Sequence, residues 1–292
     1  MRILNFGSLN VDHVYSVPRI VRPGETLSST ALNFFAGGKG ANQSVAIAKA
    51  GGDVWHAGKM GNDADWMLEK LKEFAVKTEF IRTYEGPSGR AIIQVSSEGE
   101  NSIILYGGGN QRITEEEIDD TLAQFSRGDV LVLQNEISNI PYILDKALAM
   151  GMEIVVNPAP FSQEVSGWPL ERVRTLIVNE TEAAGIAGVE AQAEEILKIL
   201  TSRYRETEIV LTLGSEGAWY ARGDERSFTE SRKVKTVDTT AAGDTFLGYY
   251  LVERFGGSDP VAAMEMAAKA AAITVSRPGA MESVPFRREL DS

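Results

Sequence analysis

Short apolar runs alternate with longer amphipathic stretches through the second half of the chain, and this alternation is what most limits its fold. Residues 130–134, 153–156, 175–178 and 208–213 are apolar enough to form buried strands, and the amphipathic stretches between them predict helices. Repeated strand–helix units imply a mostly parallel sheet that carries helices on both faces. In sheets of this kind a ligand binds outside the carboxyl ends of the strands.

Polar residues follow the predicted strands at the end where a ligand would bind. We expect these residues to line one site: Asn10, Glu136, Asn157, Asn179 and Gly214. Asn10 and Asp12 lie two residues apart in an alternating strand at 9–17, so both side chains point the same way. Such a pair is either a solvated strand face or a pair of groups that bind hydroxyls, because carboxylates accept hydrogen bonds and amides also donate them.

The first half of the chain predicts a second, smaller sheet. Strands are expected at 9–17, 27–35, 90–96 and 102–106, the last two joined by a short polar turn. We expect this sheet, from about residues 10–35 and 90–107, to form a lid inserted into a single domain that spans residues 1–292.

Residues 238–246 place small residues and one carboxylate directly before an apolar run, and the run predicts a helix at 246–255. Small residues let a backbone approach a ligand closely, and the unpaired amides that begin a helix bind anions. Asp244 is therefore either a base held beside a bound anion or an ordinary helix N-cap. The residues by themselves leave both interpretations open.

A second glycine-rich segment, residues 37–43, is predicted to be a turn that opens a helix at 44–50. The segment contains Lys39 and Asn42, but it is not a P-loop, because Lys39 is followed by Gly40 and the upstream glycine spacing differs. As a glycine-rich turn alone, the segment is a weak functional signal, and Lys39 could equally be a solvated lysine.

Composition excludes several classes of site. The chain has 292 residues, no cysteine and two histidines, so thiolate metal sites, disulfides and histidine-based triads are not expected. A formal net charge of -12 argues against a nucleic-acid partner. The first residues lack the apolar core of a signal peptide and no apolar run is long enough for a bilayer, so we expect a cytoplasmic protein with no membrane partner.

Three segments together carry a resemblance to a known family: Gly38-Lys39-Gly40-Ala41-Asn42, Asn179-Glu180-Thr181-Glu182 and residues 238–246. In this order and spacing, within residues 7–285, they resemble the signatures of the PfkB family of carbohydrate kinases, and in particular its ribokinase branch. The resemblance implies a ribokinase-like three-layer α/β sandwich with a mostly parallel central sheet and a small β-sheet lid.

The same resemblance implies an ATP-dependent sugar kinase that uses Mg²⁺ as MgATP, with K⁺ or a similar monovalent cation as activator. Phosphorylation of D-ribose at O5 to ribose 5-phosphate is the expected reaction. The alternatives are a PfkB kinase for fructose, a keto-deoxy sugar acid or a nucleoside, and a sugar-binding module that has lost turnover. The intact Ala-Ala-Gly-Asp element at 241–244 argues against the last of these.

Roles for individual residues follow from the resemblance alone. Asp244 matches the catalytic base, and the anion hole matches Ala241, Ala242 and Gly243. The positions that match the family's sugar-binding residues are Asn10, Asp12, Gly38, Lys39, Asn42, Glu136 and Asp244 itself. The magnesium element matches Asn179 and Glu182, partly through water, and the nucleotide-binding positions are Asn179, Thr212, Gly214, Gly217 and Gly243. A monovalent-cation loop matches Asp238, Thr240, Thr274, Arg277, Gly279 and Ser283.

Simpler interpretations exist for some of these residues. Glu136 could cap the helix that follows Asn139, and Glu182 could be a first-turn acid that interacts with the helix dipole. We also expect a homodimer that forms through the lid, because exposed sheet edges and apolar residues such as Val11, Val14 and Phe34 need covering.

Overall fold

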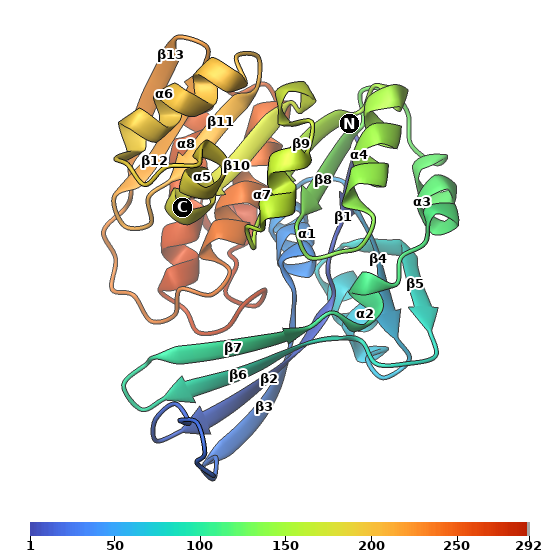
Figure 1. Cartoon of the computed structure of the whole chain (residues 1–292), viewed down its shortest axis with the longest axis vertical. Coiled ribbons are helices and arrows are strands. Elements are labelled where there is room, and N and C mark those ends of the chain that lie inside the picture. Colours follow the sequence, from blue (N-terminus) through green and yellow to red (C-terminus); the bar gives the residue numbers. More distant parts are fainter. Residues whose placement is uncertain (291–292) are drawn as a thin grey trace.

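The computed structural model describes residues 1–290 and contains two sheets (Figure 1). The larger sheet has nine strands in the order β13-β12-β11-β10-β9-β8-β1-β4-β5. Seven strands run parallel: β11 (Glu208–Thr212), β10 (Thr175–Asn179), β9 (Glu153–Asn157), β8 (Val130–Gln134), β1 (Ile3–Phe6), β4 (Val54–Gly61) and β5 (Lys77–Tyr84). The hairpin of β12 (Gly217–Arg222) and β13 (Glu225–Glu230) adds two antiparallel strands at one edge.

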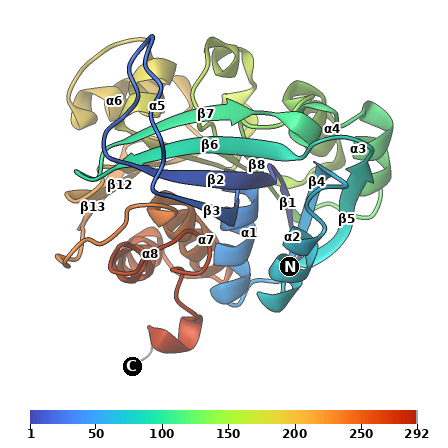
Figure 2. The same cartoon turned by 90° about the horizontal axis from the view of Figure 1, so that it is seen from below.

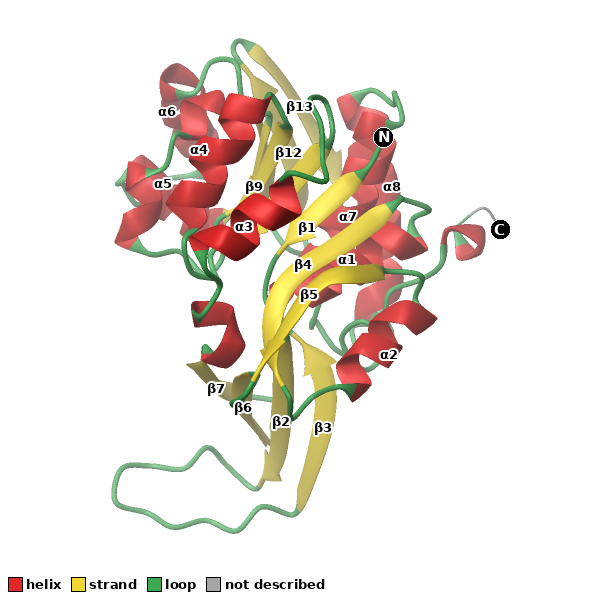
Figure 3. Cartoon of the chain, turned by 90° about the vertical axis from the view of Figure 1, so that its right-hand side faces the viewer, coloured by secondary structure: helices red, strands yellow, loops and turns green. Residues whose placement is uncertain are grey.

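Helices cover both faces of this sheet (Figure 3). One face carries α1 (Lys39–Lys49), α2 (Trp66–Glu73), α7 (Ala242–Phe255) and α8 (Pro260–Val275). The other carries α3 (Glu115–Leu122), α4 (Ile140–Met150), α5 (Glu180–Ala187) and α6 (Ala193–Arg203). Each face has its own core: Ile3 of β1 packs in the first, and Leu4 and Phe6 pack in the second. The expected three-layer, mostly parallel architecture is confirmed.

The smaller sheet has four strands in the order β3-β2-β6-β7 and projects from one end of the molecule (Figures 1 and 2). Its strands are β2 (Asn10–Val17), β3 (Ala31–Gly37), β6 (Gly89–Ser96) and β7 (Asn101–Tyr106). Because β2 leaves β1 after only three residues and β3 leads directly into α1, this sheet is joined to the larger one at the carboxyl ends of its parallel strands.

Three sequence-based predictions need correction. The helix expected at 44–50 begins at Lys39, so the glycine-rich segment forms its first turn. The strand expected at 27–35 covers Ala31–Gly37. The β12–β13 hairpin was not predicted, although Gly223-Asp224 between two six-residue strands is a hairpin signal. Among residues 1–290, no helix combines the length and apolar character needed to cross a bilayer.

Candidate active site

The first turn of α1 is placed by close backbone packing. Gly38 has φ 94°, which favours glycine, and it is the N-cap of the helix. A Cβ added at Gly40 would lie 2.6 Å from Gly7 Cα, so only glycine lets the helix lie this close to the end of β1. The Ala41 N–H donates to the Ser8 carbonyl at 3.0 Å. This packing brings Lys39 and Asn42 to the carboxyl edge of the sheet.

The first turn of α7 presents free amides to open space. Ala241 is its N-cap, in the left-handed conformation with φ 59°, and Asp244 lies within the first turn. The interpretation of Asp244 as an N-cap is therefore wrong. Within residues 1–290, the N–H groups of Gly243 and Asp244 have no hydrogen-bond acceptor, and a Cβ added at Gly243 would meet nothing within 4 Å. Unpaired amides beside open space are what an anion needs at a helix start.

The Asp244 carboxylate points toward α1. Its Oδ2 accepts from Asn42 Nδ2 at 3.2 Å and its Oδ1 from Gln43 Nε2 at 2.9 Å, and the side chain is buried. Among the described residues 1–290, Asn42 Oδ1 is buried and has no hydrogen-bond partner. A buried acceptor is costly unless a donor reaches it, so a ligand hydroxyl at this position would satisfy Asn42.

Lys39 lies among three carboxylates. Burial alone would lower the pKa of its ammonium, but the charges of Asp244, Glu136 and Glu182 raise it above its ordinary value. The lysine therefore stays protonated at neutral pH and supplies positive charge inside an acidic site.

Glu136 is held against the start of α1. Its Oε2 accepts from Ser8 Oγ and, at 3.1 Å, from the N–H of Lys39. Burial raises the pKa of the Glu136 carboxyl, while the bonds from Ser8 and the charge of Lys39 act in the opposite direction. The interpretation of Glu136 as a cap of α4 is wrong, because its carboxylate caps α1.

The predicted pair Asn10 and Asp12 lies at the junction of the two sheets. Asn10 is buried, and its Oδ1 accepts from Asn110 Nδ2 at 2.7 Å. Asn110 also accepts from the Leu9 N–H at 2.9 Å, so it fixes the chain where β2 leaves the larger sheet. Sequence reasoning missed Asn110, although it directly follows the glycine triplet at 107–109. The Asp12 carboxylate occupies the space that a side chain at position 37 would fill.

Asp12 should make the ligand-free protein less stable as the pH rises. Burial first, and repulsion by Glu136 second, raise the pKa of Asp12 from 3.8 to about 7. A raised folded-state pKa favours folding at low pH, and this contribution is lost between about pH 4 and pH 7. We expect Asp12→Asn to be more stable than wild type at pH 8, by at most about 4 kcal/mol, with the gap closing toward pH 4.

Urea unfolding of wild type and Asp12→Asn between about pH 4 and pH 8 measures the free energy of unfolding at each pH. Asp224→Asn, in an exposed turn, is the matched control and should leave the pH dependence unchanged. An equal pH dependence in wild type and Asp12→Asn would contradict the prediction.

Asn179 and Glu182 form a capping box at the start of α5. Glu182 Oε2 accepts from the Asn179 N–H at 3.0 Å, Oε1 accepts from Asn179 Nδ2 at 2.9 Å, and Asn179 Oδ1 accepts from the Glu182 N–H at 2.9 Å. Burial raises the pKa of Glu182, and its bonds to Asn179 and the charge of Lys39 oppose this shift. The simpler interpretation of Glu182 as a first-turn acid is therefore confirmed.

Asn179 and Glu182 fit a magnesium ion that enters the site bound to a nucleotide. Each Glu182 oxygen accepts one hydrogen bond, which leaves lone pairs for water or metal. Within residues 1–290 there is no cluster of three metal-ligating side chains. Mg²⁺ commonly binds through one or two carboxylates together with substrate phosphates, so a sparse protein site is sufficient.

The predicted nucleotide-binding residues lie at the turn between β11 and β12. Thr212 ends β11 beside Asn179, to which it is paired in the sheet. The Leu213 N–H donates to the Gly217 carbonyl at 2.8 Å and closes the turn. Gly214 and Gly217 have φ of 52° and 140°, and Gly217 packs against the Thr229 carbonyl. The turn therefore adjoins the start of α5 at the same edge of the sheet.

The predicted cation-loop residues come together in part. Asp238 Oδ1 accepts from the Thr240 N–H at 2.9 Å and from its Oγ1 at 2.7 Å, and Oδ2 accepts from the Gly279 N–H at 3.0 Å. Thr274 and Ser283 are buried and lie within five residues of Gly279 in the sequence. Thr274 Oγ1 lies 3.1 Å from Thr245 Oγ1 in α7. Arg277 points elsewhere, to Glu289 at 2.7 Å.

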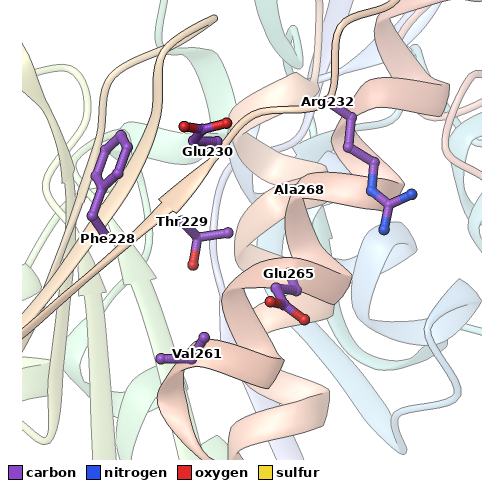
Figure 4. Close-up of a pocket in the computed structure, with 7 residues that line it drawn as sticks. All are labelled: Phe228, Thr229, Glu230, Arg232, Val261, Glu265 and Ala268. Carbon is purple, nitrogen blue, oxygen red and sulfur yellow. The ribbon is translucent and has the colours of Figure 1, made fainter.

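A hollow of about 360 Å³ lies away from these residues, between β13 and α8 (Figure 4). Thr229 on the strand and Glu265 on the helix face it, and neither belongs to the predicted site. The hollow borders the nucleotide turn on the β13 side, where Glu230 pairs with Gly217 and the Thr229 carbonyl packs against it. It is therefore not the site assembled by α1, α5 and α7.

Comparison with known proteins places this geometry in a family. The model of the pfkB family of carbohydrate kinases matches residues 2–287. The ribokinase of Staphylococcus aureus is 35% identical over 301 residues, which cover 99% of this chain and 98% of that protein.

Solved structures of ribokinases show the same similarity. The ribokinase of Cryptococcus neoformans in complex with ADP superposes with a TM-score of 0.86 at 33% identity, covering 99% and 98% of the two chains. The Arabidopsis thaliana ribokinase complexed with ribose and ATP gives 0.84 at 26% identity, covering 99% and 96%. The chain is an ATP-dependent sugar kinase and belongs to the pfkB family of carbohydrate kinases.

Proposed function

We propose that this kinase transfers the γ-phosphoryl group of ATP to O5 of D-ribose, with Asp244 as the base. The observation that carries the proposal is the pairing of two helix starts: free N–H groups at Gly243 and Asp244, and a carboxylate directed at Asn42 of α1. A phosphoryl group at the amides and a sugar beside α1 would place the attacking hydroxyl next to that carboxylate.

Positioning and charge stabilisation account for the chemistry. Phosphoryl transfer passes through a loose transition state, so the enzyme chiefly aligns the reactants and stabilises oxygen charge. The free N–H groups of Gly243 and Asp244 and the dipole of α7 provide that stabilisation. Asp244 removes the hydroxyl proton, and Lys39 adds positive charge to a site with several carboxylates. When bound, magnesium neutralises the phosphates, and Asn179 and Glu182 are the residues that would hold it.

The sugar contacts follow from the positions of polar groups at the edge of the smaller sheet. Asn10, Asp12 and Glu136 present oxygen atoms that accept from hydroxyl groups, and Asn42 offers its unpartnered Oδ1. Gly38 and Lys39 contribute the backbone at the start of α1. A ligand with several neighbouring hydroxyls satisfies more of these acceptors than one with few. The ribose in the Arabidopsis complex supports this substrate.

The smaller sheet is proposed to be a lid inserted into a single domain. It leaves the larger sheet through β2 and returns through β3 at the edge where the site lies, so movement at these connections would open and close the site. Closure would exclude water and favour transfer to sugar over hydrolysis. Since ATP is its cosubstrate, we place the enzyme in the cytoplasm.

A monovalent cation such as K⁺ is proposed to bind at the loops that Asp238 joins. Asp238 bonds to both Thr240 and Gly279, so it holds residues 238–240 against residues 274–283. Backbone carbonyls of these loops would be the main ligands. A cation there would brace the turn that ends at Ala241, the N-cap of α7.

A homodimer is proposed to form through the outer face of the lid. Four neighbouring residues cross all four strands on this face: Phe34, His13, Ile92 and Ile104. Phe34 and Ile104, at the two ends of this row, are 56% and 64% exposed, and a face that exposes large apolar side chains is typical of an interaction surface. Val11, by contrast, is buried and needs no partner.

Ile104→Glu is expected to convert the dimer to monomer, because it would bury a charge in an apolar contact. Sedimentation velocity measures the change. Val189→Glu, at an exposed apolar residue distant from the lid, should leave the dimer intact. A monomeric wild-type protein, or a dimer that survives Ile104→Glu, would refute this interface.

A coupled assay of ADP release over ribose, fructose, adenosine and a keto-deoxy sugar acid tests the function, with and without potassium. We expect ribose to give the highest kcat/KM and potassium to raise activity. A higher value with another substrate would reassign the enzyme within its family. Ribose binding without ADP release from any substrate would indicate a binding module.

A further inference from the structure

A series of buried side-chain amides, joined by hydrogen bonds, connects β1 with the Asp244 carboxylate. Gln43 Nε2 donates to Asp244 Oδ1 at 2.9 Å, and Gln43 Oε1 accepts from Gln134 Nε2 at 2.7 Å. Gln134 Nε2 also donates to Asn5 Oδ1 at 2.8 Å. All three amide side chains are fully buried, so water cannot replace a lost partner. None of the three was predicted as a site residue.

Backbone carbonyls fix which way each side-chain amide in this series is turned, because a carbonyl oxygen can only accept a hydrogen bond. Asn5 Nδ2 donates to the Gly40 carbonyl at 2.7 Å, so Asn5 must turn its oxygen toward Gln134. Gln134 must then turn its nitrogen toward Asn5, and the same nitrogen reaches Gln43 Oε1. Gln43 is left with its nitrogen toward Asp244.

The far side of Gln43 is fixed in the same way. Asn157 Nδ2 donates to the Ile177 carbonyl at 3.0 Å, so Asn157 presents Oδ1 to Gln43 Nε2 at 3.1 Å. Gln134 Oε1, in turn, is buried and finds no hydrogen-bond partner in the part of the chain that the structure describes. An unsatisfied buried acceptor costs stability, so the fold keeps this orientation of Gln134 despite an energetic penalty. A penalty retained beside the site is consistent with a role in function.

We propose that Gln43 is a positioning residue for Asp244, and that Asn5 and Gln134 act through it by keeping its N–H₂ group turned toward the carboxylate. This inference rests on the proposed role of Asp244 as the base. With Asn42 on Oδ2 and Gln43 on Oδ1, both carboxylate oxygens accept hydrogen bonds, so the orientation of the carboxylate is fixed.

Gln43→Met tests the contact between Gln43 and Asp244, because methionine has a side chain of similar length but no N–H donor. We expect kcat to fall by about 10- to 100-fold, the cost of a hydrogen bond to a charged group. The KM for sugar should change little. A loss confined to kcat marks a positioning role, because a general disturbance of the site would also raise the KM.

Gln134→Met tests the relay, since Gln134 makes no contact with Asp244. Without it Gln43 loses the donor to its Oε1 and is oriented by Asn157 and Asp244 alone, so we expect a smaller loss of kcat than in Gln43→Met, again with little change in KM. The matched control is Ser44→Ala: Ser44 Oγ accepts from Asn5 Nδ2 at 2.9 Å, but the Gly40 carbonyl still orients Asn5. This control should keep the wild-type kcat.

Thermal unfolding separates the relay from general loosening of the core. If Gln134→Met and Ser44→Ala lose similar stability but only the former lowers kcat at an unchanged KM, the relay is supported. An unchanged kcat in Gln43→Met overturns the inference. If Asp244→Asn also retains turnover, the proposed function fails; if Asp244→Asn is inactive, only the role of Gln43 is refuted.

Discussion

Asp244→Asn is expected to lower kcat by a factor of about 10² to 10⁴, the usual contribution of a positioned general base. The amide keeps the size of the side chain but cannot take the proton from the sugar hydroxyl. In the wild-type protein Asn42 and Gln43 both donate to the carboxylate. The N–H₂ group of the new amide therefore faces another donor on one of its two sides. Sugar affinity should remain close to wild type, because the hydroxyl-binding oxygens of Asn10, Asp12 and Glu136 are untouched.

Single-turnover kinetics with saturating MgATP measures the chemical step, and calorimetric titration with ribose measures sugar binding. Asp145→Asn, at an exposed position in α4, is the matched control and should have wild-type turnover. Wild-type turnover in Asp244→Asn would remove Asp244 from the role of base. Loss of both turnover and ribose binding would indicate that the substitution disrupts the site as a whole.

Gly40→Ala is expected to lower the free energy of unfolding by about 3 kcal/mol, a large cost for one methyl group. The new Cβ would lie 2.6 Å from the backbone carbon atoms of Gly7, so α1 must move away from β1. Helix propensity favours alanine over glycine by about 1 kcal/mol, which offsets only part of this cost. Displacement of α1 would also move Lys39 and Asn42, so we expect the KM for sugar to rise.

Gly243→Ala is the matched control for stability, since it is also a glycine in the first turn of a helix. A Cβ there meets nothing within 4 Å, and urea unfolding should show equal or slightly greater stability than wild type. Its methyl group would project into the space where we propose that the phosphoryl group lies, so kcat should fall. Equal stability of Gly40→Ala and wild type would contradict the close packing of α1 on β1.

The layers of the fold could be predicted because parallel strands buried on both faces leave continuous apolar runs. Residues 130–134 and 175–178 carry that pattern, and β8 and β10 form there. The hairpin at 217–230 was missed because Gly217–Arg222 and Glu225–Glu230 are mixed in polarity, as edge strands often are. The start of α1 was placed too late because glycines usually mark turns, whereas Gly40 serves a close backbone contact.

The sequence by itself determined the alternating layers, the smaller sheet and the presence of two small-residue segments next to helices, since these depend on local periodicity and on residues that permit close approach. Only the tertiary structure decided which polar groups meet. Asn5, Gln43, Gln134 and Asn157 are far apart along the chain, and each looks like an ordinary polar residue in its own segment. They share one hydrogen-bond network because parallel strands bring distant residues to the same edge, where backbone carbonyls then fix the direction of every amide.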